Sequence, residues 1–343
     1  MTKRVRVLIS TSSDPYENLA IEDHIFRTLP ADGHALMIWQ NRPVVVIGRY
    51  QNPWLECNIP LMKAHRVALA RRQSGGGTVY HDPGNLNFTW FSPADDYQRE
   101  RNIEVVIAAL GRLGFPVEMN ARKDLTLGGK KISGSAYKQT RERCFHHATL
   151  LVTADLDKLQ KYLRSPVTAV HARGTQSVRS RVTRLIDHQE VTIPAVIQAV
   201  GEEFFRLWGV SGTVEEVGWA NVSRAELDAE ARTEADARAS AGGAQTTAQT
   251  TAQQYFEKQS SWEWQYGATP SFTLAYDSAH ITIDAGCISA VVPTGGWADR
   301  DYHGLLHTPW GDVGPEHAIS RLSPGDPLRI EFEQHITKEL LEV

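Results

Sequence analysis

Three consecutive glycines, Gly75 to Gly77, constrain the fold more than any other feature of this 343-residue sequence. Glycine lacks a Cβ atom, so the backbone of such a run can turn sharply, and another group can approach its amides closely. Arg71 and Arg72 precede the run and supply planar donors that are always charged. Exposed amides beside such donors suit a phosphate or a carboxylate. We therefore predict an anion-binding loop here, and a tight turn with solvated arginines is the alternative.

The sequence around the glycines differs from the common nucleotide-binding motifs. No Lys-Ser or Lys-Thr pair follows at the spacing of a P-loop, and the glycines do not form a dinucleotide-binding fingerprint. The HExxH, GxSxG and kinase motifs are also missing from the sequence, which leaves metalloprotease, serine hydrolase and kinase functions without support. A different anion-binding architecture is needed.

A second cluster, Lys130 to Lys138, begins with two adjacent lysines. They follow Gly128-Gly129, a dipeptide typical of a tight hairpin turn. Neighbouring side chains of a strand point to opposite faces, so only one of the two lysines can point inward. An inward ammonium group can neutralise an oxyanion. An exposed lysine-rich hairpin is the alternative, but the small residues from Ser133 to Ala136 suit a narrow site better than a surface strand.

Overall composition restricts the partners and the compartment. The chain has 36 lysines and arginines against 40 aspartates and glutamates, so its net charge of −4 argues against nonspecific nucleic-acid binding. An acidic partner would have to meet a local basic patch. Three distant cysteines without a CxxC spacing indicate neither a disulfide framework nor a zinc site. No apolar run is long enough to cross a membrane, and the first ten residues read as a strand rather than a leader, so we expect a cytoplasmic protein.

Helices and strands alternate without a strict βαβ rhythm, which favours a mixed sheet flanked by helices, an α/β (α+β) fold. The expected half-buried sheet includes the alternation Leu86, Phe88, Trp90. Helical periodicity predicts helices over Tyr16–Leu29, Ile103–Leu113 and Pro194–Trp208, the first with Asp14 as N-cap and Pro15 at its first position. Strands are expected at Ala35–Trp39, Val44–Ile47 and Thr149–Val152.

Composition also suggests where the chain divides into domains. A stretch without aromatic residues, about 223–254, ends in a repeated Gln-Thr-Thr-Ala pattern and reads as a low-complexity insertion. We expect a catalytic domain over 1–265 that contains this insertion, and a small α+β accessory domain over 269–343.

These motifs together resemble the lipoate-protein ligase family. The resemblance rests on Arg-Arg-x-x-Gly-Gly-Gly-x-Val-x-His-Asp-x-Gly-Asn at 71–85, and on Lys-Ile-Ser-Gly-Ser-Ala at 131–136. Further similar blocks follow in the same order: Asn18–Glu22, Val46–Trp54, Phe145–Leu151, Ser177–Arg181 and Ser261–Trp264. The resemblance covers Val7 to Gly267 and is loose after that.

The resemblance implies a catalytic domain like that of biotin protein ligases and class II aminoacyl-tRNA synthetases, followed by an accessory domain. It implies that the protein uses ATP and Mg²⁺ to convert lipoate to lipoyl-AMP. The lipoyl group would then pass to a lysine of its partners, which are the lipoyl domains of 2-oxoacid dehydrogenase E2 subunits and the glycine cleavage H protein. No nucleic acid or membrane is expected as a partner.

The resemblance also assigns the site residues. Lys131 is the expected catalytic residue, in contact with the lipoyl carbonyl and the adenylate phosphate. Asp124 is an expected contact of Mg²⁺ or of the adenine. The full expected binding set is Arg72, Gly75, Gly76, Gly77, Thr78, Val79, Tyr80, Asn85, Asp124, Lys131 and His147. His147 follows His146 on a strand, so one ring is expected to face inward and the other outward.

Two alternatives stay open at this point. A lipoyltransferase would use lipoate that is already activated or attached to a carrier. Thr78 mildly favours this alternative, because many ligases carry alanine at this position. A non-catalytic sensor could keep the pocket for a carboxylate or a nucleotide, although Lys131 with both arginines argues against a decayed site. Release of pyrophosphate from ATP would separate the ligase from both.

Overall fold

The computed structural model describes residues 4–165, 167, 171–178, 180–222, 252–311 and 315–341. The expected insertion at 223–254 lies outside the described residues except for its last three positions. Contacts within the chain define two compact units, each made of three separate segments. Unit 1 comprises 1–42, 81–155 and 180–259, and unit 2 comprises 43–80, 156–179 and 260–343. The expected boundary between a catalytic domain and an accessory domain, at 265–269, divides the chain in another way than these units. It stays a prediction.

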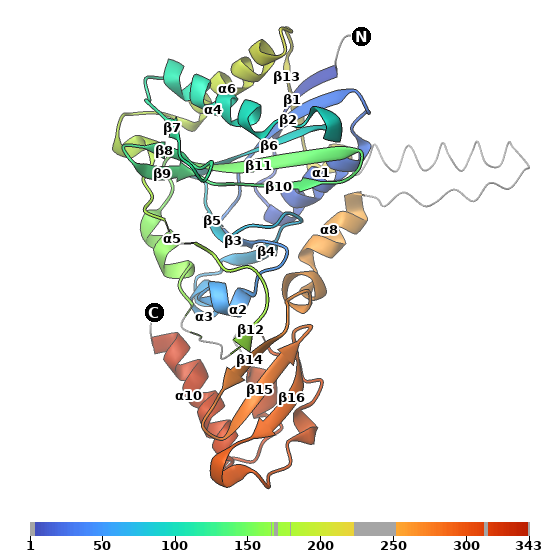
Figure 1. The fold of residues 1–343 in the computed structure, drawn as a ribbon, viewed down its shortest axis with the longest axis vertical. Coiled ribbons are helices and arrows are strands. Elements are labelled where there is room, and N and C mark those ends of the chain that lie inside the picture. Colours follow the sequence, from blue (N-terminus) through green and yellow to red (C-terminus); the bar gives the residue numbers. More distant parts are fainter. Residues whose placement is uncertain are drawn as a thin grey trace, which may run out of the picture. The chain divides into compact units, whose positions relative to one another are not determined.

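Unit 1 is built on a six-stranded mixed sheet (Figure 1). Across the sheet its strands are β10 (Ser135–Gln139), β11 (Arg143–Leu151), β6 (Asn85–Pro93), β2 (Gly33–Trp39), β1 (Arg4–Ser10) and β13 (Val214–Val217). The pairs of β1 with β2 and with β13 are parallel, and the remaining pairs are antiparallel. A smaller antiparallel sheet holds β7 (Glu118–Met119), β8 (Leu125–Leu127) and β9 (Lys130–Ser133). The expected mixed sheet is confirmed.

Helices cover both faces of the large sheet. One face packs against α4 (Arg99–Arg112) and α6 (Ile193–Leu207) in a continuous apolar core, and the other faces α1 (Pro15–Thr28) (Figure 1). A fourth helix, α8 (Ala252–Ser260), follows the undescribed stretch. Asp14 caps α1 by accepting hydrogen bonds from the amides of Tyr16 and Glu17, as expected.

Strand β6 corrects one expectation. Leu86, Phe88 and Trp90 enter the core beneath α4 and α6, as their alternation predicts. The polar residues between them, Asn87 and Thr89, are equally buried, because α1 covers their face. The sheet is therefore buried on both faces at β6, not half-buried.

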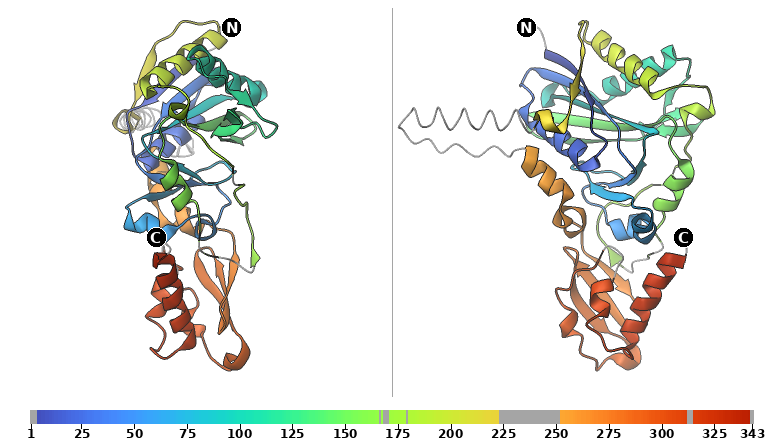
Figure 2. Two further views of the ribbon diagram at one scale, coloured as in Figure 1. Left: turned by 90° about the vertical axis from the view of Figure 1, so that its left-hand side faces the viewer. Right: turned by 180° about the vertical axis from the view of Figure 1, so that it is seen from behind.

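Unit 2 contains two sheets (Figure 2). Apolar side chains of both sheets belong to one buried cluster. The first has β4 (Ala68–Arg71), β3 (Val44–Ile47) and β5 (Val79–His81), and the second has β12 (His171–Ala172), β14 (Phe272–Ala275), β15 (Ala279–Asp284) and β16 (Cys287–Pro293). The helices are α2 (Pro53–Glu56), α3 (Ile59–Ala64), α5 (Leu156–Tyr162), α9 (Glu316–Ile319) and α10 (Pro327–Leu341), with a π-helical turn at Glu263–Gly267. Ile47 of β3 and Phe332 of α10 belong to the same cluster, so the C-terminal residues complete the core beneath the glycine-rich segment.

Candidate active site

Arg71 is a structural residue. Its side chain is fully buried and donates hydrogen bonds to the carbonyl oxygens of Gln51 (2.7 Å) and Gln265 (2.7 Å) and to Thr269 Oγ1 (2.8 Å), among other acceptors. Burial lowers the pKa of Arg71 to about 10, which leaves the guanidinium charged at neutral pH. The expectation that both arginines supply donors to an anion is therefore wrong for Arg71, whose donors are occupied by the protein itself.

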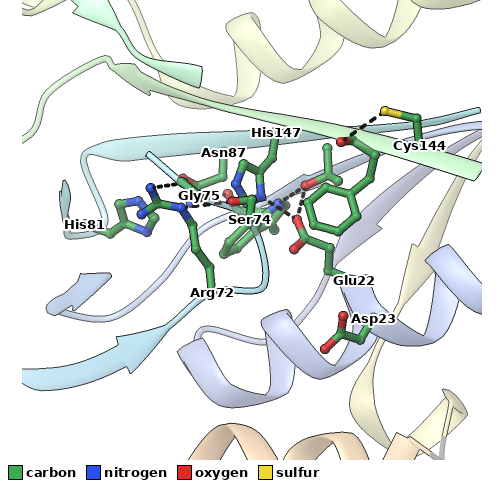
Figure 3. Close-up of polar contacts among 12 residues, drawn as sticks. Glu22, Asp23, Arg72, Ser74, Gly75, His81, Asn87, Cys144 and His147 are labelled. Atoms are coloured by element: carbon green, nitrogen blue, oxygen red, sulfur yellow. Dashed lines mark hydrogen bonds and ion pairs between the residues drawn. The ribbon is translucent and has the colours of Figure 1, made fainter. Parts of the chain in front are cut away.

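Arg72 holds the glycine-rich segment in shape (Figure 3). Its Nη2 donates to the carbonyl oxygens of Gly75 (2.6 Å) and Gly77 (2.7 Å), and its Nε donates to Ser74 Oγ (3.0 Å). Gly76 has φ +88°, a conformation that favours glycine. A Cβ atom on Gly48 would lie 2.3 Å from Gly76 O, so the two backbones approach more closely than any side chain would allow.

Thr78 connects the glycine-rich segment to Ser177. The Thr78 amide donates to Ser177 Oγ at 2.9 Å, and Thr78 Oγ1 donates to Gln51 Oε1 at 2.9 Å. Gln51 Nε2 also donates to Ser177 Oγ (3.0 Å), and the Ser177 amide donates to Glu56 Oε1 (3.2 Å). Sequence reasoning missed Gln51 and Glu56, although Gln51 lies inside one of the family-like blocks. Of the other expected residues in this unit, Val79 and Tyr80 lie on β5, and Tyr80 is buried against Tyr162.

Lys131 lies on the hairpin that the sequence predicts. Strands β8 and β9 flank Gly128 and Gly129, whose φ values are +57° and +74°. Lys130 is exposed, whereas the Lys131 ammonium lies 2.9 Å from the Asp124 carboxylate. A Cβ atom on Gly134 would lie 3.0 Å from Lys131 Nζ, so this glycine leaves room for the lysine side chain. Two of the expected site residues therefore form a partly buried ion pair.

His147 belongs to a buried polar network in unit 1 (Figure 3). Its Nδ1 lies 2.9 Å from Glu22 Oε1, which also accepts a hydrogen bond from Thr89 Oγ1 (2.7 Å). Trp39 Nε1 donates to Thr89 Oγ1 at 3.0 Å, and Asn87 Nδ2 donates to Trp39 O at 3.2 Å. Asn85, another expected residue, is fully buried and donates to Asn87 Oδ1 (3.0 Å), which extends the network along β6.

Glu22 is the carboxylate of this network, and sequence reasoning missed it as a site residue. It lies between Leu19 and Phe26 on the buried face of α1, and an acidic residue at such a position is the signal that could have identified it. His146 and His147 do point to opposite faces of β11, but neither ring faces outward, because helices cover both faces. Burial lowers the pKa of His146 to about 3, with a further contribution from nearby His147 and Arg99.

The expected residues are divided between the two units. Unit 1 carries Asn85, Asp124, Lys131 and His147, and unit 2 carries Arg72, Gly75–Gly77 and the segment Thr78–Tyr80. Among the described residues no group of three or more His, Cys, Asp or Glu side chains is arranged to hold a metal ion. None of the described helices is long and apolar enough to span a membrane.

Residues 14–205 match the family model of the lipoyl protein ligase A/B catalytic domain. The match extends over more than half of the chain and includes both motif clusters. The chain belongs to the lipoyl protein ligase A/B family. The expected family and its ligase class are thereby confirmed.

Individual relatives agree with this membership of the lipoyl protein ligase family. A lipoate-protein ligase A of Psychrobacter cryohalolentis is 41% identical over 277 residues, which is 79% of this chain and 74% of that protein. A Thermoplasma acidophilum protein assigned as a lipoate protein ligase was solved with bound lipoic acid; it is 26% identical, has a TM-score of 0.59, and the match covers 78% of this chain and all of that one. A lipoate-protein ligase A solved with ATP is 29% identical with a TM-score of 0.55, over 63% of this chain and 90% of that chain.

Proposed function

We propose that this protein is an ATP-dependent lipoate-protein ligase, which forms lipoyl-AMP and transfers the lipoyl group to a lysine of a carrier protein. Family membership supports the activity. The observation that carries the assignment to this site is the ion pair between Asp124 and Lys131, the first residue of the second family motif, because a catalytic lysine must be held in place.

In the first step the lipoate carboxylate attacks the α-phosphate of ATP, and pyrophosphate leaves. In the second step the amine of the carrier lysine attacks the acyl carbon of the mixed anhydride and expels AMP. Both steps develop negative charge on oxygen. The Lys131 ammonium is suited to stabilising that charge, and one well-placed donor of this kind contributes about 3–4 kcal/mol. Taken by themselves, the amides of Gly75–Gly77 in unit 2 suit a phosphate. Arg72 acts by fixing the glycine carbonyls, so that the intervening amides keep their direction.

Mg²⁺ would neutralise the phosphate charge of ATP when it is bound. The only carboxylate that the sequence offered as a ligand, Asp124, is paired with Lys131, and one carboxylate does not make a protein cage for the ion. The residues described therefore do not fit a metal site held by the protein, and we expect Mg²⁺ to arrive with ATP.

The carrier partners we propose are the lipoyl domains of E2 subunits and the H protein. We propose that the reaction takes place in the cytoplasm.

The first test measures pyrophosphate release with ATP, Mg²⁺ and lipoate, and then lipoyl transfer to an apo lipoyl domain. Lys131→Ala should abolish both, because it removes the ammonium that both steps require. Lys130→Ala is the matched control, since its exposed neighbouring side chain should be dispensable. Transfer from synthetic lipoyl-AMP without any ATP-dependent release would instead assign a lipoyltransferase. Binding of lipoate or ATP without pyrophosphate release or lipoyl transfer would instead support a non-catalytic sensor.

A further inference from the structure

Strand β10 forms an edge of the six-stranded sheet, and none of the described strands pairs with its outer side (Figure 1). It follows β9, the strand of Lys131, with only Gly134 between them. Each residue spans at most about 3.6 Å, so Ser135 lies within about 14 Å of Lys131 along the chain. An open sheet edge is a template for pairing with another strand. The edge of β10 is therefore an open template close to the proposed catalytic lysine.

Hydrogen bonds at the two ends of β10 determine which of its backbone groups face β11. The Thr140 amide donates to Arg143 O (2.8 Å), and the Thr149 amide donates to Gly134 O (3.0 Å). In an antiparallel ladder every second residue bonds to the same neighbour, so the even-numbered residues of β10 face β11. The residues whose N–H and C=O groups point away from the sheet are Ser135, Tyr137 and Gln139.

The same region is strongly basic. Residues 130–143, which we call the basic hairpin, contain five cationic side chains and one acidic side chain, although the whole chain has a net charge of −4. The cationic residues are Lys130, Lys131, Lys138, Arg141 and Arg143, and the acidic one is Glu142. Lys131 is paired with Asp124 just outside the hairpin, which leaves four cationic side chains against one acidic side chain. A second copy of the chain would place two such hairpins edge to edge, where they repel. The charge therefore favours an acidic partner over self-pairing.

Side chains that interfaces favour also lie at β10, on the face of the sheet to which its odd-numbered residues point. Tyr137 is 51% exposed, and its ring centre lies 6.0 Å from that of Tyr97. Arg99 donates to Ser135 Oγ at 3.0 Å, which holds its guanidinium beside the strand. Tyrosine and arginine are enriched among the residues that contribute most to protein–protein binding.

We propose that β10 is the docking edge for the carrier domain, and that an exposed acidic strand of the carrier pairs with the backbone of Tyr137 and Gln139. This inference rests on the proposed function, because it is the transfer step that requires a carrier. Docking on β10 would bring the carrier lysine to the acyl group beside Lys131.

The test removes one outward amide without changing the bonds between β10 and β11. Gln139→Pro deletes that donor, and proline is tolerated at an edge strand when its nitrogen faces away from the sheet. Gln139→Ala is the matched control, since it removes the side chain and keeps the amide. Transfer from lipoyl-AMP to an apo lipoyl domain should show a carrier KM raised about two- to tenfold in Gln139→Pro, which corresponds to the loss of one net hydrogen bond. Gln139→Ala should have the carrier KM of the wild type, and both variants should release pyrophosphate at the wild-type rate.

Arg141→Glu gives a second measurement that does not depend on the fold tolerating a proline. Arg141 is exposed and lies outside the strands, so its replacement changes the charge of the hairpin and leaves the strand pairing intact. Its carrier KM should rise severalfold at low salt, and the effect should shrink as salt is added. Gln139→Pro with normal pyrophosphate release and a normal carrier KM would overturn docking on β10. If Gln139→Pro fails to fold, an unchanged KM in Arg141→Glu overturns it instead.

Two other results have distinct meanings. A wild-type dimer that dissociates in Gln139→Pro while the carrier KM stays constant would show that a second copy occupies the edge, which overturns the proposal. A wild-type protein that neither releases pyrophosphate nor transfers lipoyl groups would contradict the proposed function itself.

Discussion

Replacing Arg71 by glutamine should destabilise the protein substantially. The buried guanidinium donates to five backbone carbonyls, at residues 48, 49, 51, 264 and 265, and to Thr269 Oγ1. A glutamine amide can donate only two hydrogen bonds, so several buried acceptors would lose their donor. Each buried acceptor left without a donor costs about 1–3 kcal/mol, so the loss of two such donors already costs about 2–6 kcal/mol. At about 2–4 °C per kcal/mol, Tm should fall by on the order of 10 °C.

The assay is thermal unfolding followed by tryptophan fluorescence, because Trp264 Nε1 donates to Arg71 O at 2.6 Å and its indole should respond when this region loosens. Arg66→Gln is the matched control, since that arginine is exposed on the same unit. Arg71→Lys should be intermediate, because an ammonium keeps the charge but has fewer donors. A Tm within about 2 °C of the wild type, together with a raised KM for ATP, would refute the structural role and return Arg71 to the anion site.

Three further predictions concern unit 1. Because burial lowers the pKa of His146 to about 3, below the ordinary 6.5, the unfolded chain binds more protons between these values and the native protein loses stability as pH falls below 6.5. The loss should be about 2 kcal/mol between pH 7.5 and pH 5, and urea unfolding of His146→Phe should show none of it. Asp124→Asn should lower the rate of pyrophosphate release about tenfold by releasing Lys131; rescue by excess Mg²⁺ would show instead that Asp124 binds the metal. Glu22→Gln should cost about 1–3 kcal/mol in urea unfolding, since His147 and a threonine hydroxyl lose a charged acceptor, and an unchanged midpoint would contradict the network.

Local patterns allowed several elements to be predicted from the sequence. Asp14 and Pro15 predict the start of α1, and Gly128-Gly129 predicts the turn before Lys131, because capping and turn geometry depend only on neighbouring residues. Helix α6 was expected one residue late at both ends, over Pro194–Trp208 instead of Ile193–Leu207. Terminal turns depend on packing that periodicity does not contain.

The roles of the two arginines could not be separated from the sequence. Both are equally suited to an anion by residue type. Both donate to groups of the protein, but the acceptors of Arg72 include the neighbouring Ser74 and Gly75. The hydrogen-bond acceptors of Arg71 include Gln265 and Thr269, which lie 194 and 198 residues further along the chain. Glu22 is a similar case, since His147 lies 125 residues away. Nothing near either residue in the sequence reveals such a partner.

The three-segment construction of unit 2 has a consequence for how the protein is made. Arg71 leaves the ribosome 198 residues before Thr269, which at about 5–20 residues per second is a delay of about 10 to 40 s. During that time β3 and β4 cannot bury their apolar side chains against the C-terminal residues of their cluster, because those residues do not yet exist. The nascent glycine-rich segment should therefore stay accessible to chaperones and proteases until the residues of α10 have been synthesised.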